Sequence, residues 1–209
     1  QPNRSFFVQR YAGVNPANGN PLFLTADGDL TEQLIDSERV YVDKSSVPFW
    51  LGGFGFNINW KGFGLTTQFV WFGDHYRNNL DIADLEGNPS ITGSNSAASL
   101  LRAWSQPGDI TDIPRINGPI STIDMFNQTD RFIENASYLR LRNVTLGYTF
   151  SKDQLVKAPF TGVRIFAQAE NPLTFTGFRA FYPEGAFTTV NNSQFPTPII
   201  ITFGVNVNF

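Results

Sequence analysis

The sequence contains no cysteine and a single histidine. Without cysteine, the chain has no disulfide framework, thiolate metal site or cysteine nucleophile. His75 follows Asp74 in "FGDHYRNN", and one carboxylate neighbour gives too few ligands for an ordinary metal site. No serine nucleophile motif accompanies it. We therefore predict that His75 is a solvated loop residue, and we expect no catalytic residue, no metal ion and no cofactor.

Long apolar runs and clusters of basic residues are also missing. A membrane-spanning helix needs about 20 consecutive apolar residues, and none occurs in this chain, whose mean hydropathy is -0.17. Any contact with a membrane must therefore be made by strands. The net charge of -3 and the lack of a Lys/Arg cluster argue against a nucleic-acid-binding surface. The first residues do not form a signal peptide, so we expect either that the protein is not exported or that its beginning is missing.

Aromatic residues are abundant instead, at 15% of the chain, and many lie in segments that alternate apolar and polar residues. The clearest segments are 49–60 and 62–73, which flank a Lys61-Gly62 turn typical of a β-hairpin. Each has the length of about 9 to 11 residues that a tilted strand needs to cross a bilayer. Three further segments alternate in the same way: 138–150, 161–170 and 198–209. Aromatic residues near the segment ends match the two interfacial girdles of outer-membrane barrels: Trp50, Trp60, Trp71, Phe150 and Phe209.

The connections between these segments alternate between short and long, which fixes the direction of the strands. Residues 61–62 and 152–160 form short connections, and 152–160 reads as a single helical turn. Residues 74–137 and 171–197 form long ones. Because outer-membrane barrels have short periplasmic turns and long extracellular loops, we expect the last strand to run down to the periplasmic girdle. Phe209 is expected to end there and to act as the assembly signal.

The predicted fold is all-β, a transmembrane antiparallel β-barrel of which this chain supplies five strands. Residues 1–47 are expected to form an extracellular loop and hairpin region that includes the end of a barrel strand, with a turn at Asp27-Gly28. Residues 48–209 are expected to hold the barrel strands with their long loops. Bacterial single-chain barrels have even strand numbers from eight upward, so the sequence reads as a C-terminal piece of a larger barrel.

One segment does not fit a simple alternation. In "YLRLRNVTLGYTF" an unbroken pattern would place Arg140 and Arg142 on the lipid side, where an arginine at the bilayer midplane costs about 2 to 4 kcal/mol. We therefore predict a β-bulge near Arg142-Asn143 that turns both arginines inward and turns Leu139 and Leu141 outward.

Four phrases carry a family resemblance: "RYAGVNPANGNPLF" at 10–23, "WSQPGDITDIPR" at 104–115, "NASYLRLRNVTLGYTF" at 135–150 and "AQAENPLTFTGFRAFYPE" at 167–184. Each resembles a stretch of the SusC/RagA family of TonB-dependent outer-membrane transporters. Their order and spacing are similar to the last quarter or so of such a protein, and the resemblance covers essentially the whole chain.

The resemblance implies a 22-stranded barrel that surrounds an N-terminal plug and is energised through TonB. It also implies a bacterial outer-membrane location of the Bacteroidetes type, a SusD-like surface lipoprotein that covers the lumen, and import of glycans or peptides. The other implied partners are the remainder of the barrel and plug, the TonB complex through the missing N-terminal part, and outer-membrane lipid. The signal peptide, TonB box and plug are not in this sequence.

Loop residues suited to stacking on sugars or to anchoring a partner protein are candidates for the working surface. We single out seven of them: Tyr76, Trp104, Arg115, Phe178, Arg179, Phe181 and Tyr182. Packing within the loops is the alternative role for the aromatic members.

The acidic segment "ADGDLTEQLIDSE" at 26–38 also has two interpretations. It lacks the regular ligand spacing of a calcium loop. We interpret it as a hairpin turn, with calcium binding as the alternative.

Two other protein classes stay open from the sequence alone. A soluble aromatic-rich β-sandwich, such as a carbohydrate-binding module, would not need aromatic strand ends or alternating loop lengths. An outer-membrane barrel enzyme or adhesin would share the strands. An enzyme would need a His, Ser or carboxylate constellation on the upper rim, where only His75 is available.

Overall fold

The structure is a computed structural model that describes residues 5–87, 95–156, 159–180, 182–184, 190–191 and 197–209. The chain divides into two compact units. We call the first the sheet unit: Phe49–Gly73, Ser137–Gly177 and Phe195–Phe209. The second is the loop unit: Gln1–Pro48, Asp74–Ala136 and Phe178–Gln194.

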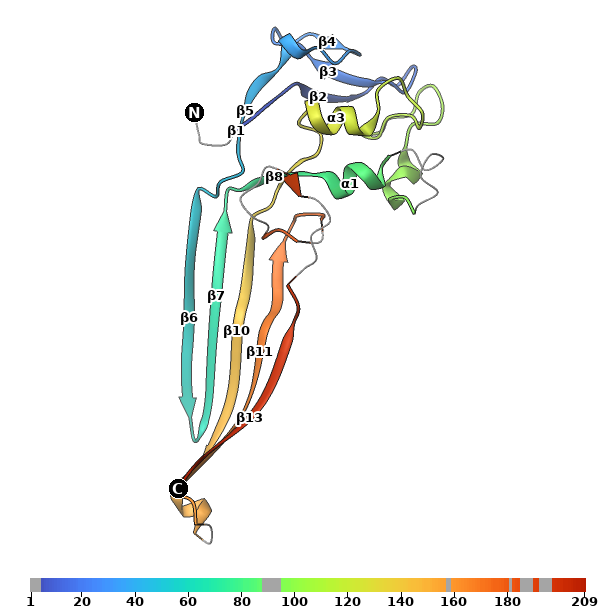
Figure 1. Cartoon of the computed structure of the whole chain (residues 1–209). Helices are drawn as coiled ribbons and strands as arrows, with labels where there is room; N and C mark the ends of the chain where they lie inside the picture. The colour runs from blue at the N-terminus through green and yellow to red at the C-terminus, as the bar shows by residue number, and fades with distance from the viewer. Residues whose placement is uncertain (1–4, 88–94, 157–158, 181, 185–189, 192–196) are drawn as a thin grey trace. The chain divides into compact units, whose positions relative to one another are not determined.

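The sheet unit is one antiparallel sheet of five strands in the order β13-β11-β10-β7-β6 (Figure 1). The strands are β6 (Trp50–Trp60), β7 (Phe63–Gly73), β10 (Tyr138–Phe150), β11 (Gly162–Thr176) and β13 (Ile200–Asn208). All five predicted strands are present. Lys61 and Gly62, with φ of 46° and 89°, form the predicted tight turn between β6 and β7. Between β10 and β11 lies the predicted helical turn, η3 (Lys152–Leu155), where Gln154 Oε1 accepts a hydrogen bond from the Ser151 N–H at 2.9 Å.

Strand β11 is longer than the sequence suggested. The boundary predicted between the strand at 161–170 and the loop at 171–197 is wrong, because β11 continues to Thr176. Asn171 and Pro172 lie in an irregular stretch where the register with β10 skips two residues of β11. Proline cannot donate a ladder hydrogen bond, so Asn-Pro reads as a strand end, but proline is tolerated at bulges.

The predicted bulge in β10 is confirmed. The register of β10 with both of its neighbours shifts between Leu141 and Asn143, so Arg142 is an extra residue relative to β7. The bulge resets the alternation of the upper part of the strand, because one inserted residue exchanges the two sides for everything beyond it.

The leucines and arginines near the bulge point as predicted. Leu139 and Leu141 pair with aromatic residues of β7 on the apolar side of the sheet. On the opposite side, Arg140 Nε donates a hydrogen bond to Thr174 Oγ1 at 2.9 Å. Arg142 Nη1 donates to a side-chain oxygen of β11 at 3.4 Å. Both guanidinium groups thus have polar partners on β11.

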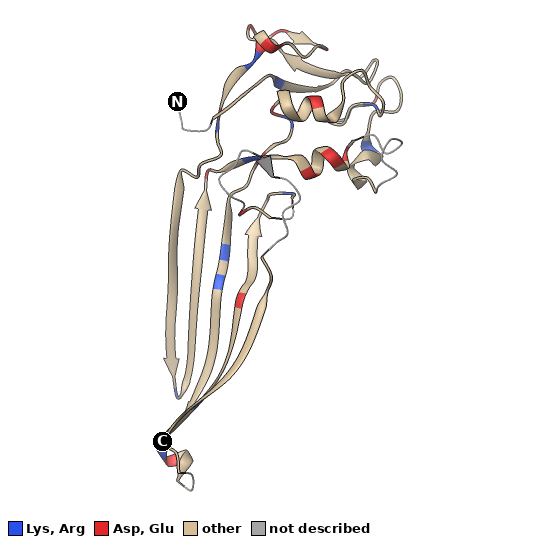
Figure 2. Ribbon diagram, in the orientation of Figure 1, with Lys and Arg blue, Asp and Glu red and all other residues tan. Residues whose placement is uncertain are grey.

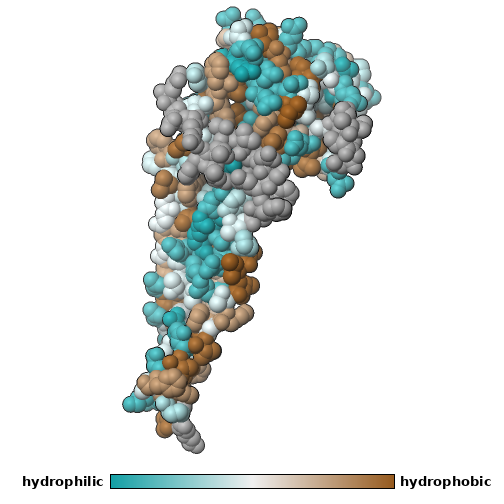
Figure 3. Space-filling model, viewed as in Figure 1, coloured by the Kyte–Doolittle hydropathy of each residue, from teal (hydrophilic) through white to brown (hydrophobic). Residues whose placement is uncertain are grey.

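The two sides of the sheet differ in character. One row on the apolar side joins all five strands: Ile58, Leu65, Leu146, Ala167 and Phe203. The adjacent row faces the other way and is polar: Asn57, Thr66, Thr145, Gln168 and Thr202. Figure 2 shows that the sheet carries few charged residues. Figure 3, which views one face, shows hydrophilic residues gathered along the sheet with hydrophobic ones beside them.

The apolar side is exposed. Every residue of β6 is exposed, and Phe203 on β13 keeps 79% of its surface accessible. The sheet unit contributes no second layer over this side in the described residues. A β-sandwich would bury the apolar sides of two sheets against each other, whereas a lipid-facing surface requires this exposure.

Phe166 is an aromatic residue on the polar side. It lies in register between two glycines, Gly147 on β10 and Gly204 on β13. A Cβ at Gly204 would overlap the Phe166 ring, so the ring occupies the space above that glycine. The guanidinium carbon of Arg164 lies 5.9 Å from the ring centroid. Gly204 therefore makes room for the ring, and the space beside Gly147 holds the Arg164 guanidinium group.

The loop unit is built from short elements. Its strands are β1 (Ser5–Val8), β2 (Arg10–Val14), β3 (Pro21–Leu24), β4 (Leu30–Thr31), β5 (Val40–Ser45), β8 (Tyr76–Asn79), β9 (Ile133–Asn135) and β12 (Val190–Asn191). Its helices are η1 (Asp36–Glu38), α1 (Leu80–Leu85), η2 (Ala98–Arg102) and α3 (Thr122–Gln128). The hairpin of β3 and β4 turns through Gly28, with φ of 94°, which confirms the turn predicted at Asp27-Gly28.

Two hydrophobic clusters hold the loop unit together. The larger one contains Phe23, Ala83, Met125, Phe126 and Phe132. The smaller one contains Phe6, Val8, Val42 and Ile133. Each cluster joins residues that are far apart in the sequence, so the loop unit is a packed body. Among the described helices, none is both long enough and apolar enough to span a membrane.

The side assignment around the bulge can be tested by placing one charge on each side. We expect Leu141→Arg to reduce the assembled fraction of the full-length protein, because an arginine in the lipid-facing band costs up to about 2 to 4 kcal/mol. Asn143→Arg, opposite Glu170 on the polar side, should leave assembly near the wild-type level. Heat-modifiable gel mobility of purified outer membranes measures the assembled fraction. Equal losses in the two variants would contradict the assignment.

Candidate functional site

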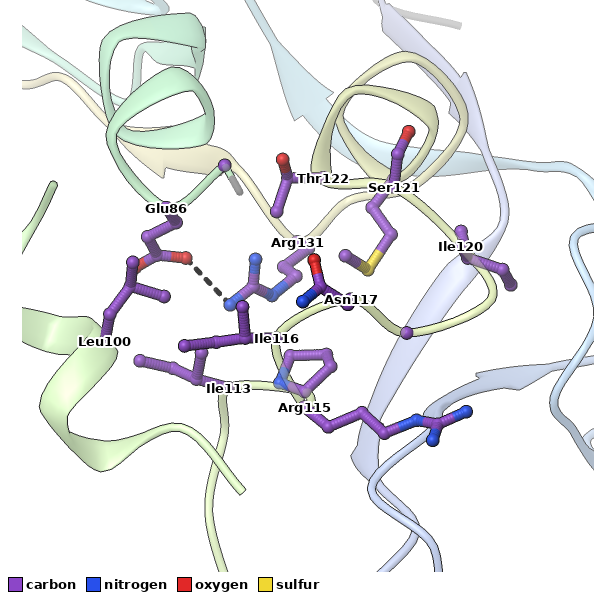
Figure 4. A pocket seen from close by; sticks show the side chains of 14 residues that line it. Glu86, Leu100, Ile113, Arg115, Ile116, Asn117, Ile120, Ser121, Thr122 and Arg131 are labelled. Carbon is purple, nitrogen blue, oxygen red and sulfur yellow. Dashed lines mark ion pairs between the residues drawn. The ribbon is translucent and has the colours of Figure 1, made fainter. Parts of the chain in front are cut away.

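The loop unit contains a cavity of about 360 Å³ (Figure 4). Its walls come from the end of α1, from η2, from residues 113–122, and from α3 with the segment that follows it. A large part of the lining is aliphatic: Leu100, Ile113, Ile116, Ile120 and Met125. Figure 4 shows an ion pair between Glu86 and Arg131 at one side of this space.

Two helix caps position the charged residues of the cavity. At the start of α1, Asn79 Oδ1 accepts a hydrogen bond from the Ile82 N–H at 3.2 Å, and Glu86 is the C-cap of the same helix. Ser121 Oγ caps α3 by accepting a backbone hydrogen bond at 3.1 Å. Apolar residues of α3 and of the segment after it are buried in the larger cluster. This packing carries Arg131 to the cavity.

The ion pair is almost completely buried. Arg131 Nη2 lies 2.8 Å from Glu86 Oε2, and the two side chains are 7% and 4% exposed. Ser99 Oγ donates a hydrogen bond to Glu86 Oε1 at 2.9 Å, and the guanidinium carbon lies 4.6 Å from the centroid of the Phe132 ring. These contacts offset the cost of removing two charges from water. Arg131 Nη1, however, has no hydrogen-bond acceptor among the described residues, and Glu86 Oε2 has no hydrogen-bond donor there beyond its ion-pair contact with Arg131.

Tyr11 lies close to the same guanidinium group. Its ring centroid is 5.4 Å from the guanidinium carbon of Arg131. Burial raises the pKa of Tyr11 to about 12, although the Arg131 charge and a side-chain hydrogen bond with Arg131 act in the opposite direction. The phenol is therefore protonated at neutral pH, and it donates a hydrogen bond to the Asp112 carbonyl oxygen at 3.0 Å. This contact ties the segment 104–115 to β2.

Trp104 and Arg115 anchor the same segment to the turn at 15–20. The Trp104 indole lies over Gly19, and its Nε1 donates a hydrogen bond to the Pro16 carbonyl oxygen at 3.0 Å. The Arg115 N–H donates to the Gly19 carbonyl oxygen at 2.9 Å, and its Nε donates to Asn20 Oδ1 at 3.1 Å. Trp104 is thus half-buried by packing, while Arg115 remains exposed and lines the cavity.

Glu32 holds the turn at 15–20 together. Its carboxylate accepts side-chain hydrogen bonds from Asn15 at 2.6 Å, Asn18 at 2.9 Å and Asn20 at 2.7 Å. These hydrogen bonds hold the pKa of Glu32 below its ordinary value. Of the five carboxylates in the acidic segment 26–38, Glu32 is therefore engaged by amides, Asp36 pairs with Arg39 and Glu38 accepts a hydrogen bond from the Ala26 N–H. Among the described residues, no group of three or more His, Asp or Glu side chains is placed to hold a metal ion.

Arg179 is bound within the loop unit. Its Nε and Nη2 donate hydrogen bonds to Glu134 Oε1 at 2.9 and 2.6 Å, and its N–H donates to Glu134 Oε2 at 3.2 Å. Glu134 belongs to β9 and raises the pKa of Arg179 further through these hydrogen bonds. Arg179 is thereby held as an anchor of the segment after β11, although it remains exposed.

Tyr76, Phe178 and Tyr182 are not among the residues that line the cavity. Phe178 is buried, and Tyr76 is half-buried with Lys44 Nζ 5.7 Å from its ring centroid. Tyr182 is half-buried, and its hydroxyl donates to Glu184 Oε2 at 2.9 Å. Phe181 lies outside the described residues. Of the seven predicted contact residues, the cavity lining includes Arg115.

The prediction that His75 is solvated is wrong. Its exposed fraction is 3%, and its Nδ1 lies 3.2 Å from the Ala136 carbonyl oxygen. The Ala136 N–H in turn donates to the His75 carbonyl oxygen at 2.7 Å. This backbone pairing buries the ring where β8 meets β9. Burial lowers the pKa of His75, and the Arg77 charge adds to the effect, so the ring is neutral at pH 7.

The predicted girdle residues lie in the sheet unit. Trp50, Trp60, Trp71 and Phe209 are exposed, and Phe150 is half-buried. Their role at the membrane interfaces stays a prediction.

Sequence reasoning missed the two residues that form the buried ion pair. Glu86 follows an apolar helical stretch and Arg131 precedes the apolar pair Phe132-Ile133, but a charge beside apolar residues is common. The residues are separated by 44 intervening positions, and no spacing rule connects them. The packing of α1 against α3 brings them together.

The packing of Trp104 on Gly19 can be tested with a matched pair of glycine substitutions. Gly19 and Gly28 have φ of 76° and 94°, so alanine is strained by about 1 to 2 kcal/mol at either site. Alanine at Gly19 also displaces the Trp104 ring, whereas nothing lies within 4 Å of a Cβ at Gly28. We expect Gly19→Ala to increase tryptic cleavage after Arg102 and Arg115 severalfold in the assembled protein. Gly28→Ala should not, and equal cleavage in both variants would refute the packing role.

The Glu32 network should make the turn at 15–20 sensitive to acid. The pKa of Glu32 is lower in the folded protein than its ordinary value of 4.5, so its stabilising contribution is present above that value. The contribution is lost as the pH falls through the folded pKa. Hydrogen exchange of residues 15–20, corrected for intrinsic rates, should therefore accelerate below about pH 4. In Glu32→Gln the turn should be weaker at neutral pH and should show little of this dependence; an unchanged acid response would contradict the assignment.

Comparisons with known proteins place these observations in context. No protein-family profile matches the chain. It is 26% identical over 186 residues to the TonB-dependent receptor P3 of Formosa agariphila, covering 89% of this chain and 17% of that protein. It is also 26% identical over 220 residues to the TonB-dependent receptor SusC of Bacteroides thetaiotaomicron, covering 98% of this chain and 19% of that protein. The chain therefore spans about a fifth of the length of these relatives.

Solved structures agree with the sequence relatives. The RagAB peptide transporter matches with a TM-score of 0.84 and 29% identity, over 98% of this chain and 23% of that chain. The RagAB peptide importer in its closed-closed state matches with a TM-score of 0.85 and 28% identity. These similar proteins are receptors and transporters, not enzymes. The described sheet is open between β6 and β13, as a segment of a larger barrel would be. The predicted resemblance to the SusC/RagA family of TonB-dependent transporters, and the predicted transmembrane antiparallel barrel fold, are therefore both confirmed.

Proposed function

We propose that this chain forms part of the wall and outer rim of a TonB-dependent importer in the bacterial outer membrane. The observation that carries the proposal is the likeness to the RagAB peptide transporter over 98% of the chain. The two-sided sheet supports it, because apolar residues would face lipid and polar residues would line a lumen. The rest of the barrel, the plug and the contact with the TonB complex would be supplied by residues outside this chain.

We assign the loop unit to the extracellular side. Residues 1–47 and 74–137, together with the segment between Thr176 and residue 197, would then form the outer rim. The size of these connections supports the assignment, since capping two strand pairs requires only a few residues. A folded body with its own hydrophobic clusters is suited to binding, as rim loops positioned by a rigid scaffold commonly are.

The partner of this rim would be a SusD-like surface lipoprotein, and the cargo would be peptides or glycans. The matches to SusC and RagAB support a partner of this kind. Similarity to a peptide transporter favours peptides as the cargo.

Two apolar side chains of the rim are suited to the partner contact. Leu101 is 91% exposed and Ile110 is 97% exposed, on either side of Trp104 in the sequence. Trp104 and Arg115 hold this segment to the turn at 15–20, so the two apolar side chains are presented on an anchored support. The predicted contact residues Tyr76, Phe178, Arg179, Phe181 and Tyr182 stay proposals for the same surface.

The partner contact can be tested with a double substitution, Leu101→Asn with Ile110→Asn. If the lipoprotein buries both side chains, each substitution removes about 1.5 to 3 kcal/mol of binding free energy that comes from apolar burial. We therefore expect co-purification of the lipoprotein with the full-length protein to fall by about tenfold or more. Peptide uptake should fall with it, while heat-modifiable mobility shows normal assembly.

Val156→Asn is the matched control. Val156 is 80% exposed and lies in the short connection between β10 and β11, which would face the periplasm. Its substitution should change neither co-purification nor uptake. Wild-type co-purification by the double variant would remove the proposed contact, and wild-type uptake would remove the working role of the rim.

A further inference from the structure

We propose that the cavity between α1, η2 and α3 is a binding site for a small neutral molecule that carries an amide or other carbonyl oxygen on a branched aliphatic body. This proposal does not depend on the proposed import function. It rests on the size of the cavity, on the chemistry of its walls and on one buried donor.

The cavity is much larger than the space that a single ordered water molecule occupies. Its volume is about 360 Å³, whereas one water molecule takes about 30 Å³ in the liquid. Small-molecule sites range from about 300 to 1,000 Å³ and are mostly apolar, with a few placed polar groups. The cavity therefore falls at the small end of the range for ligand sites.

The walls select an aliphatic occupant. Ile113 and Met125 are 3% and 1% exposed, and the other apolar lining residues are Leu100, Pro114, Ile116 and Ile120. The lining residues that the structure describes include no aromatic ring. Sugars are commonly held by stacking on such rings, so the cavity suits branched alkyl groups better than a glycan.

Polar residues also line the cavity, among them Asn117, Ser121 and Thr122, but Arg131 is the one with a buried donor that lacks an acceptor in the described part of the chain. Its side chain is 7% exposed, and its Nη1 has no hydrogen-bond acceptor among the described residues. A buried N–H without an acceptor is unfavourable, so an occupant that supplies an oxygen gains affinity from it. Figure 4 shows the guanidinium group among the lining side chains, with its other terminal nitrogen directed to Glu86.

The charge of the occupant follows from the ion pair. Glu86 already neutralises Arg131, at 2.8 Å. A carboxylate on the occupant would lie close to the buried Glu86 charge and would meet like-charge repulsion. The guanidinium group of Arg115 is bound at Asn20 and in Figure 4 extends away from the ion pair, so it does not supply a second countercharge. A neutral carbonyl oxygen meets none of these costs.

The test uses the full-length protein, purified in detergent, and the probe N-acetyl-leucine amide. We expect saturable binding by calorimetry or ligand-observed NMR with a Kd of about 1 mM or below, as a ligand of this size allows. N-acetyl-leucine, which replaces the amide by a carboxylate, should bind at least fivefold more weakly. Absence of saturable binding by the amide would overturn the proposal, and tighter binding of the acid would overturn its choice of a neutral occupant.

A pair of isoleucine substitutions locates the binding. Ile116 lines the cavity and is 43% exposed, whereas Ile123 on α3 is 45% exposed and is not among the lining residues. Ile116→Trp should fill the cavity and weaken binding of the amide at least tenfold, while Glu86 and Arg131 themselves are left unsubstituted. Ile123→Trp should bind like the wild type. Equal affinity in the two variants would place the probe elsewhere and reject the site.

A third variant addresses the donor. Arg131→Lys keeps a positive charge beside Glu86 but removes the second planar donor nitrogen. We expect the amide to bind severalfold more weakly while heat-modifiable mobility is retained. Unchanged affinity in an assembled Arg131→Lys protein would show that Nη1 is not the determinant. If this variant fails to assemble, the two isoleucine variants still decide whether the probe binds in this cavity.

Discussion

The sheet depends on backbone pairing across five strands. A peptide N–H or C=O left unpaired in hydrocarbon costs several kcal/mol. The ladders between β6, β7, β10, β11 and β13 satisfy most of these groups, and the outer edges of β6 and β13 have no partner strand among the described residues. Once the pairing is set, the two-residue period assigns every side chain to one side of the sheet. The bulge at Arg142 is the point where the sequence leaves that period and the pairing absorbs the extra residue.

The loop unit obeys a different constraint, because its short elements cannot stabilise themselves. Segments distant in sequence are joined by buried rings and by a few polar anchors. The turn at 15–20 is the clearest case, since Glu32 fixes it from one side and the segment 104–115 covers it from the other. Two of the segments that carry the family resemblance, 10–23 and 104–115, therefore contact each other. This contact gives a physical reason for both segments to resemble the family together.

Much of the sheet could be predicted from the sequence because period, turn residues and the cost of a lipid-facing arginine all act locally. The same local logic failed at Asn171-Pro172, where a strand continued through a bulge, and at His75. Burial of His75 depends on the pairing of β8 with β9, whose partner residues lie about 60 positions apart. The cavity beside the Glu86–Arg131 ion pair could not be predicted from the sequence for the same reason, because only tertiary packing makes those two residues neighbours.

Phe166 lies in register with Gly147 and Gly204, and this arrangement bears on the width of the lumen in the proposed barrel. An aromatic ring on the inner side of a barrel would normally narrow the opening by projecting toward its axis. Here the ring occupies the space that Gly204 leaves empty on the adjacent strand, and Gly147 flanks it on the other side. In the proposed importer, the wall would therefore present an aromatic surface to a passing molecule with the ring lying over the backbone at Gly204.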